Sequence, residues 1–276
     1  MNVTESLTSL FSFVIGLVAG SFFNVLIYRL PREESIVWPG SHCPHCNHAI
    51  RLWENIPVIS FIMLRGKCSH CKAAISLMYP AVELVSGLVA VVLWRWYIIP
   101  MISASTIPWQ IPVTIFQSLI LLSMIPLFII DCKHYIIPDL LTIPGLFLAI
   151  IFSFFPSGLT PLECALGIAA GGGSLLAVGF LGKYLLKKEE VMGGGDIRLM
   201  ALVGALWGWK IAIVCIFIAS LLGSFAGVIL IVLRRLRKDR RIPFGPFLAA
   251  GVWLAVLTVE KLSAWYFNWL DSFIAY

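Results

Sequence analysis

The sequence predicts an all-α polytopic membrane protein with about eight transmembrane helices and one small polar domain between the first two of them. Of its 276 residues, 60% are hydrophobic and 12% are charged, and the mean hydropathy is +0.95. These values exclude an ordinary soluble globular domain. Uncharged stretches long enough to cross a bilayer recur along the chain, and one long polar segment interrupts them early.

Eight segments are the predicted transmembrane helices. The segment from Tyr79 to Val92 is the second and contains one acid, Glu83. The segment from Leu199 to Trp207 is too short for a full crossing at about 1.5 Å per residue, and we count it as the sixth span, across a thinned region. The other six are uncharged stretches: Ser6 to Tyr28, Trp96 to Ile130, Leu140 to Leu162, Cys164 to Gly182, Ile211 to Leu233 and Ile242 to Val259.

The basic residues predict the orientation of the chain. The net charge is +6, and every basic cluster follows an odd-numbered span, which the positive-inside rule assigns to the cytoplasm. Both termini are then outside, and the first span is retained because no basic segment or cleavage site precedes it. Since topology already explains these charges, we expect the lipid bilayer as a partner and no nucleic acid.

The first span has one small and polar face. Gly16, Gly20, Ser21 and Asn24 follow one another at about one helical turn. This spacing predicts close packing against another helix. In the alternative, Asn24 and Arg29 near the cytoplasmic end line a site.

The polar segment, residues 29 to 78, contains the pairs Cys43/Cys46 and Cys68/Cys71, with 21 residues between them, 47 to 67. Four thiolates form a closed tetrahedral zinc site, which we expect to be structural because it has no open position. Disulfides are the weaker alternative in a reducing cytoplasm. Three neighbouring residues are alternative ligands: His42, His45 and His70.

Three further features lie near the predicted membrane boundary: Glu83, Asp139 and the segment Asn55 to Phe61. Glu83 is either a functional acid or a paired structural one, because a lone acid in a span is costly. Asp139 precedes an apolar run, and we expect it to cap that helix. The segment Asn55 to Phe61 is too short to span and is expected on the membrane surface.

Two acids at apolar boundaries suggest catalysis. Asp131 ends the third span, and Asp196 follows three glycines at the start of the sixth, so the topology puts both on the cytoplasmic side. Two close carboxylates share a proton; the ionised one can activate water while the protonated one polarises a peptide carbonyl. In the alternative, both are helix caps or charge partners of Lys133 and Arg198.

These motifs, taken in order, resemble the bacterial prepilin peptidases, the type IV leader peptidase and N-methyltransferase family. The likeness covers nearly the whole chain, and Gly193-Gly194-Gly195-Asp196 resembles the G-x-G-D motif of these aspartic proteases. The other matching pieces are Gly20 to Pro31, the two cysteine pairs, Asn55 to Val58, Arg65 to Cys68, Tyr79-Pro80 with Glu83, and Asp131 through Asp139.

The resemblance implies a bifunctional enzyme of the bacterial cytoplasmic (inner) membrane, with its active site facing the cytoplasm. It implies that Asp131 and Asp196 cleave the basic leader of type IV prepilin or pseudopilin precursors after a glycine. It also implies methylation of the new N-terminal amine by S-adenosylmethionine, with Gly66, Lys67 and Glu83 expected near this donor. The expected domains are the first helix (1–28), a four-cysteine region linked to methyl transfer (29–78) and the peptidase core (79–276).

Two other functions fit some of the same features. An ion-coupled transporter also uses intramembrane acids, but it predicts acids near the midplane and inverted repeats, and here the acids lie at loop boundaries. A zinc-stabilised membrane scaffold would keep its function without both aspartates, whereas a peptidase would not.

Overall fold

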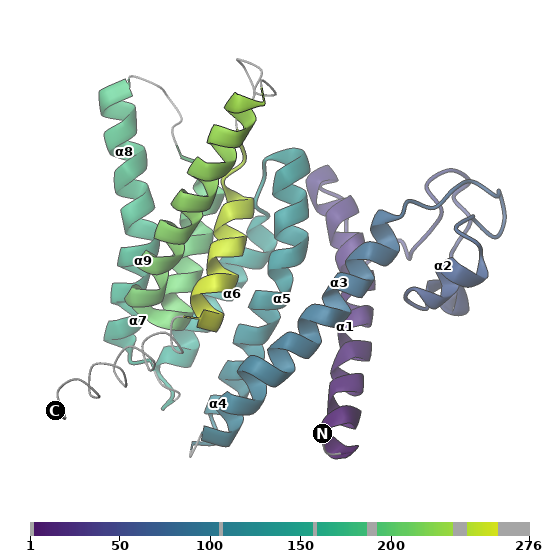
Figure 1. The fold of residues 1–276 in the computed structure, drawn as a ribbon, viewed down its shortest axis with the longest axis horizontal. Coiled ribbons are helices and arrows are strands. Elements are labelled where there is room, and N and C mark those ends of the chain that lie inside the picture. Colours follow the sequence, from purple (N-terminus) through teal and green to yellow (C-terminus); the bar gives the residue numbers. More distant parts are fainter. Residues whose placement is uncertain (1–2, 105–106, 157–158, 187–191, 234–241, 259–276) are drawn as a thin grey trace. The chain divides into compact units, whose positions relative to one another are not determined.

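The computed structural model describes residues 3–104, 107–156, 159–186, 192–233 and 242–258. In these ranges the chain forms helices and two isolated β-bridges but no strand, so the predicted all-α class is confirmed. The helices are α1 (Val3–Arg29), α2 (Ile59–Met63), α3 (Met78–Leu93), α4 (Ile99–Ala104), α5 (Gln110–His134), α6 (Asp139–Ser153), α7 (Pro161–Ile168), α8 (Ser174–Leu186), α9 (Gly194–Val232) and a last helix, Gly245–Thr258 (Figure 1).

The chain packs as two units. Unit 1 contains Met1–Ala104 and Leu122–Ile129, and unit 2 contains Ser105–Leu121 and Ile130–Tyr276. Helix α5 therefore contributes residues to both units. The first helix and the cysteine-bearing segment share unit 1, and both candidate catalytic aspartates belong to unit 2. The domain boundaries drawn at residues 28 and 78 stay a prediction.

In unit 1, α1 and α3 pack closely along the small face of α1. A Cβ on Gly16 would lie 2.5 Å from the carbonyl oxygen of Ser86, and one on Gly20 would lie 2.7 Å from the Cα of Glu83. Glycine is therefore required at both positions for the backbones to approach. The Ser12 hydroxyl also donates to the Ala90 carbonyl over 2.8 Å. The predicted packing face is confirmed.

The second span is longer than the sequence indicated. Helix α3 continues through a π-helical turn, η3 (Trp94–Ile98), into α4, and the continuous helical segment is Met78–Ala104. The prediction ended this helix at about Val92, before Arg95. In the structure the Arg95 Nε donates to the Ser9 hydroxyl of α1 over 2.9 Å, so the charged side chain has a polar partner inside the helix pair.

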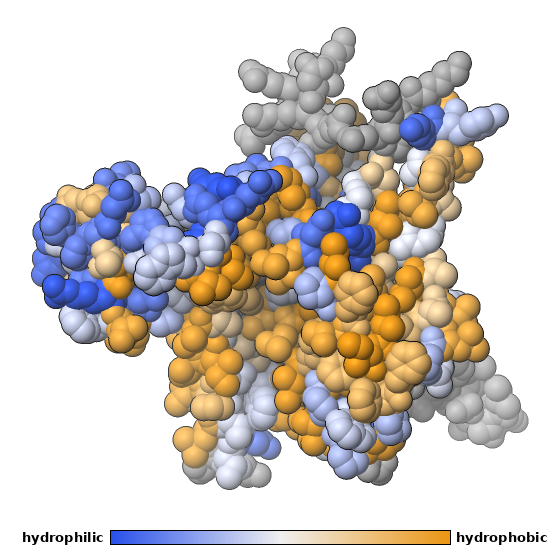
Figure 2. Space-filling model, turned by 180° about the vertical axis from the view of Figure 1, so that it is seen from behind, coloured by the Kyte–Doolittle hydropathy of each residue, from blue (hydrophilic) through white to orange (hydrophobic). Residues whose placement is uncertain are grey.

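Between α1 and α3 lies the polar region of unit 1. Figure 2 shows hydrophilic side chains gathered over this region, whereas apolar side chains cover the helices. A 3₁₀ turn, η2 (Leu52–Asn55), precedes the short helix α2. On α2, Ile59, Ile62 and Met63 are exposed. An exposed apolar face of this kind is compatible with the predicted membrane-surface location, which stays a prediction.

In unit 2, α7 and α8 are joined by a second π-helical turn, η4 (Ala169–Gly173), and pack against α9. Gly167 and Gly204 face each other so closely that neither position has room for a Cβ. Gly171 lies against the carbonyl of Met200 in the same way. Gly167, Gly171 and Gly204 therefore let these helix backbones approach closely.

Helix α9 folds back on itself at Gly208. This residue has φ 82° and ψ 172°, a conformation that is essentially restricted to glycine. The Cys215 Sγ lies 3.8 Å from the Met200 Sδ, whereas 15 residues of straight helix would separate them by about 22 Å. The predicted division into a short sixth and a longer seventh helix is therefore correct.

Five helical segments are long and apolar enough to cross a membrane: Thr4–Arg32, Met78–Ala104, Gln110–His134, Pro161–Leu185 and Gly194–Val232. Two apolar helices are shorter, Asp139–Ser153 and Gly245–Thr258. Since α9 has two arms, the described residues contain eight apolar segments that correspond to the eight predicted spans. Their eight crossings stay a prediction. Two basic loops used for the orientation lie largely in 187–191 and 234–241, outside the described residues.

Candidate functional site

Asp131 lies in the last turn of α5 and is buried, with 6% of its surface exposed. The backbone amide of Gly245, which opens the last helix, faces its carboxyl group. Its Oδ2 atom nevertheless has no hydrogen-bond partner in the described part of the chain. A buried carboxyl oxygen without a partner is costly, which makes Asp131 a functional candidate. Because it ends a helix, it is no N-cap.

Asp196 lies in the first turn of α9, three residues after the N-cap Gly193. Its carboxyl group reaches back to the amide of Gly193, as the acid of a capping box does. Asp196 is therefore not the N-cap of α9, although its carboxyl group contacts the amide of the residue that is. The same carboxyl group also interacts electrostatically with that of Asp131. The structure thus brings together the two aspartates that the sequence paired.

Ile137 and two glycines fill the space around the aspartates. A Cβ on Gly245 would lie 2.6 Å from the Asp131 Oδ2 and 3.2 Å from the Ile137 Cδ1. A Cβ on Gly195 would lie 2.7 Å from the Ile137 Cβ. Both positions therefore require glycine if the carboxyl groups are to keep their places.

The glycines before Asp196 differ in how much they are constrained. A Cβ on Gly193 would lie 2.9 Å from the Asp196 Oδ2, and one on Gly195 would meet Ile137. A Cβ on Gly194 has no neighbour nearer than an Arg198 nitrogen at 3.8 Å. The geometry therefore explains a G-x-G-D motif, because only its middle position tolerates a side chain.

Asp139 has a different role from the one predicted. It is the first residue of α6, the N-cap is Pro138, and no side chain caps this helix. The Asp139 Oδ1 instead pairs with the Arg198 Nη2 over 2.6 Å. The prediction that Asp139 caps the helix is therefore wrong, because the α9 cation provides a stronger partner for its carboxylate. This pair also removes Arg198 as the charge partner of Asp196.

The four predicted metal ligands form one cluster. The sulfur atoms of Cys43, Cys46, Cys68 and Cys71 all lie within 4.8 Å of one another. The two cysteine pairs have the same backbone conformation 25 residues apart. Asn47 and Lys72 both have positive φ, and the bridges His42–Ala49 and Lys67–Ala74 both close their loops. Such paired knuckles present two thiols each to one ion.

The cluster fits a tetrahedral ion with four sulfur ligands. The Cys43 and Cys71 sulfur atoms are 3.9 Å apart, close to the ~3.8 Å that zinc–sulfur bonds of about 2.3 Å would give. This distance excludes a disulfide between them. Backbone amides of Cys71 and His70 lower the pKa of Cys68 to about 6, which favours the thiolate that a metal needs. The rings of His48 and His70 stack at 4.8 Å between the two knuckles.

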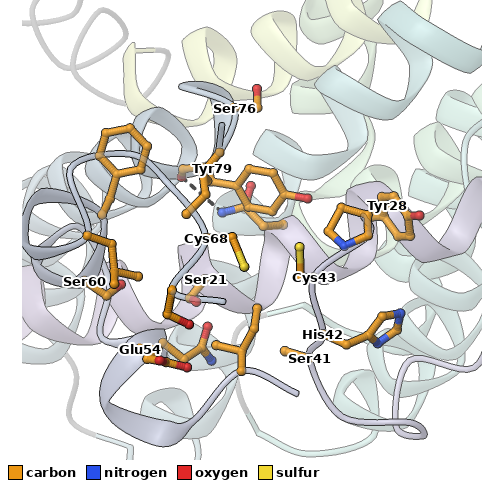
Figure 3. Close-up of a pocket in the computed structure, with 18 of the residues that line it drawn as sticks. Ser21, Tyr28, Ser41, His42, Cys43, Glu54, Ser60, Cys68, Ser76 and Tyr79 are labelled. Carbon is orange, nitrogen blue, oxygen red and sulfur yellow. Dashed lines mark hydrogen bonds between the residues drawn. The ribbon is translucent and has the colours of Figure 1, made fainter. Parts of the chain in front are cut away.

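Beside the cysteine cluster lies a cavity of about 360 Å³. Its walls come from the end of α1, the start of α3, both knuckles and the segment between them, as Figure 3 shows for Ser21, Cys43, Cys68 and Tyr79. All its lining residues belong to unit 1.

Comparisons with known proteins agree with this geometry. Residues 14–97 match the family model for the bacterial peptidase A24 N-terminal domain, and residues 118–228 match the type IV leader peptidase family. A relative from Stutzerimonas stutzeri, named prepilin leader peptidase/N-methyltransferase, is 38% identical, over 92% of this chain and 91% of that protein. The chain belongs to this prepilin peptidase family.

Two other relatives with the same printed name support the assignment. The one from Pseudomonas aeruginosa is 36% identical, over 92% of this chain and 91% of that protein. The one from Aeromonas hydrophila is 34% identical, over 92% of both chains. No solved structure matches the chain.

In this prepilin peptidase family member, the residues predicted to lie near S-adenosylmethionine do not all line one cavity. Glu83 lines the cavity, whereas Gly66 and Lys67 are not among its lining residues. Gly66 has φ +68° and turns the chain into the second knuckle. The sequence alone predicted no role for Gly245. It lies between Pro243 and Pro246 at the start of a helix, and this pattern is too common to identify a functional residue.

Proposed function

We propose that the chain is a bifunctional membrane enzyme. In this proposal it removes the basic leader of type IV prepilin or pseudopilin precursors after a glycine and methylates the new N-terminal amine. The observation that carries the peptidase assignment is the unpaired Oδ2 of buried Asp131, next to a second carboxyl group. The printed names of the relatives support both activities.

The two aspartates have the groups that peptide hydrolysis needs. Close carboxyl groups hold one proton between them, since both cannot ionise cheaply. The ionised one takes a proton from water, whose oxygen attacks the scissile carbonyl carbon. The protonated one donates a hydrogen bond to the carbonyl oxygen. When the carbon–nitrogen bond breaks, a carboxyl proton goes to the departing nitrogen, and the pair again holds one proton.

In unit 1, we assign zinc to the four cysteines as a structural ion that links the two knuckles. The near-tetrahedral sulfur spacing supports this choice, because an all-thiolate closed site is typical of structural zinc. Its place beside the cavity would fix the cavity walls. S-adenosylmethionine, the proposed methyl donor, supplies an electrophilic methyl group when it is bound. The apolar segments and the relatives support a location in the bacterial inner membrane, and we infer that the aspartates face the cytoplasm.

The decisive experiment compares Asp131→Asn and Asp196→Asn with Asp139→Asn. Purified protein in detergent is incubated with a prepilin-like substrate, and leader loss is followed by mass spectrometry. Each dyad variant should lower the cleavage rate by at least about 10³-fold, because an amide cannot take the proton of water. Asp139→Asn is the matched control, since its half-exposed carboxylate belongs to an ion pair. Cleavage at the wild-type rate in either dyad variant would refute the assignment.

A further inference from the structure

The cavity of unit 1 contains a buried acceptor without a donor. Asn24 lines this cavity and is buried, with 4% of its surface exposed. Its Nδ2 donates to the carbonyl of Tyr79 over 3.1 Å, the bond drawn as a dashed line in Figure 3. Its Oδ1 has no hydrogen-bond partner within the described ranges.

The orientation of this amide follows from its partner. The Tyr79 carbonyl can only accept a hydrogen bond, so the NH₂ group of Asn24 must face it and the oxygen must face away. A buried amide oxygen without a donor costs roughly 1–3 kcal/mol. A ligand with N–H or O–H groups in the cavity would remove this cost.

The cavity wall carries charged groups of both signs, and three histidines, His42, His45 and His48, also line it. Two carboxyl groups line it, those of Glu54 and Glu83. The backbone amide of Arg51 and the Ser69 hydroxyl lower the pKa of Glu54, so its carboxylate is charged. The one arginine of the wall, Arg29, directs its guanidinium nitrogens to backbone carbonyls, among them those of Ser35 and Pro39. The two carboxyl groups provide acceptors for a cationic ligand in the cavity.

A strained turn fixes one of these acids. Val58 has φ 62° and ψ −46°, and the amide of Ile59 donates to the carbonyl of Pro57 over 2.6 Å. This is a γ-turn with positive φ at a β-branched residue, which is rare and costly. The strained turn directs the Val58 amide to the Glu83 Oε2 at 2.8 Å. Glu83 is thereby held in place at the wall of a cavity whose volume suits one medium-sized ligand.

We propose that this cavity binds the sulfonium methyl donor, S-adenosylmethionine, and that Asn24 Oδ1 accepts a hydrogen bond from it. The proposal rests on the methyltransferase part of the proposed function. The donor is a cation with several N–H and O–H groups, which suit the two wall carboxyl groups and the unpaired oxygen. In the transfer, the amine nitrogen forms a bond to the methyl carbon while the carbon–sulfur bond breaks. Sulfur keeps that electron pair as a neutral thioether, and the methylated ammonium then loses a proton to water.

The test measures donor binding separately from turnover. Purified full-length protein in detergent is equilibrated with radiolabelled S-adenosylmethionine in dialysis cells, without a pilin substrate. Asn24→Leu removes the acceptor at similar volume and should weaken binding at least 10-fold. Gln110→Leu, which removes a side-chain amide in unit 2, outside this cavity, is the control and should bind normally.

Leader cleavage and metal content report on the fold of each variant. Normal binding by a folded Asn24→Leu variant would overturn the proposed location. If wild type itself binds no donor, the methyltransferase function fails instead. If Asn24→Leu does not fold, ultraviolet cross-linking of the labelled donor to the wild-type protein tests where the donor binds. Label in peptides that contain residues 21–29 or 79–83 supports the cavity, and label only elsewhere overturns it.

Discussion

Replacing Gly245 by alanine tests whether the space around Asp131 matters for cleavage. The added Cβ would lie 2.6 Å from the Asp131 Oδ2 and 2.9 Å from its Cγ. A comfortable carbon–oxygen contact needs about 3.3 Å, so the groups must separate by about 0.7 Å (3.3 − 2.6). Ile137 at 3.2 Å blocks movement on another side. The carboxyl group of Asp131 would therefore have to move.

The expected consequence is a loss of catalysis larger than the loss of stability. A displacement of 1 Å at a reacting group can cost on the order of 100-fold, so a shift of about 0.7 Å should lower the cleavage rate roughly 10- to 100-fold. Overpacking should cost about 1–3 kcal/mol of stability. The assay follows leader removal in detergent, together with thermal unfolding of the same samples.

Gly194→Ala is the matched control for this prediction. It places the same methyl group in the first turn of α9, two residues before Asp196, where the nearest atom would be 3.8 Å away. It should cleave at close to the wild-type rate. The argument from steric contact is refuted if Gly245→Ala keeps full activity, or if Gly194→Ala loses as much.

Three other variants test separate parts of the structure. Gly167→Ala should abolish folding, because its methyl group would collide with the Gly204 carbonyl, whereas Gly173→Ala has open space and should yield normal monodisperse protein on size-exclusion chromatography. Asp139→Asn should lower the free energy of unfolding by less than about 1 kcal/mol, since its ion pair is half-exposed, and a larger drop in thermal stability would contradict this estimate. Cys71→Ser should lower the zinc content that elemental analysis measures, relative to wild type, while leader cleavage persists, because the cluster and the aspartates belong to different units.

The sequence predicted the helical class and the pairing of Asp131 with Asp196 because both depend on strong local signals. Apolar runs of membrane length need no knowledge of neighbours, and an acid at an apolar boundary is rare enough to be noticed. The end of the second span was predicted wrongly, because the polar partner of Arg95 is Ser9, 86 residues away in the chain. A helix boundary inferred from one stretch of sequence cannot take such a distant partner into account.

The details of both candidate sites depend on contacts that no local pattern contains. Asp139 had the sequence context of a helix cap, yet its carboxylate binds Arg198 on another helix. Gly245 is required by the carboxyl group of Asp131, which lies more than a hundred residues earlier in the chain. Asn24 had small neighbours at one-turn spacing, which indicated packing, and only the position of Tyr79 determines which way its oxygen faces.

The chemistry of the two proposed activities fixes their order. A peptide nitrogen shares its lone pair with the carbonyl, so it cannot attack a sulfonium methyl group. Hydrolysis turns it into an amine whose pKa is about 7.7–8.0, and a usable fraction is then neutral near pH 7. Asp131→Asn should therefore stop methylation of an intact precursor. The same variant should still methylate a synthetic peptide that begins at the mature N-terminus, because its cavity is unchanged in unit 1. Failure on this peptide, with wild type active on it, would mean that the dyad also serves methyl transfer.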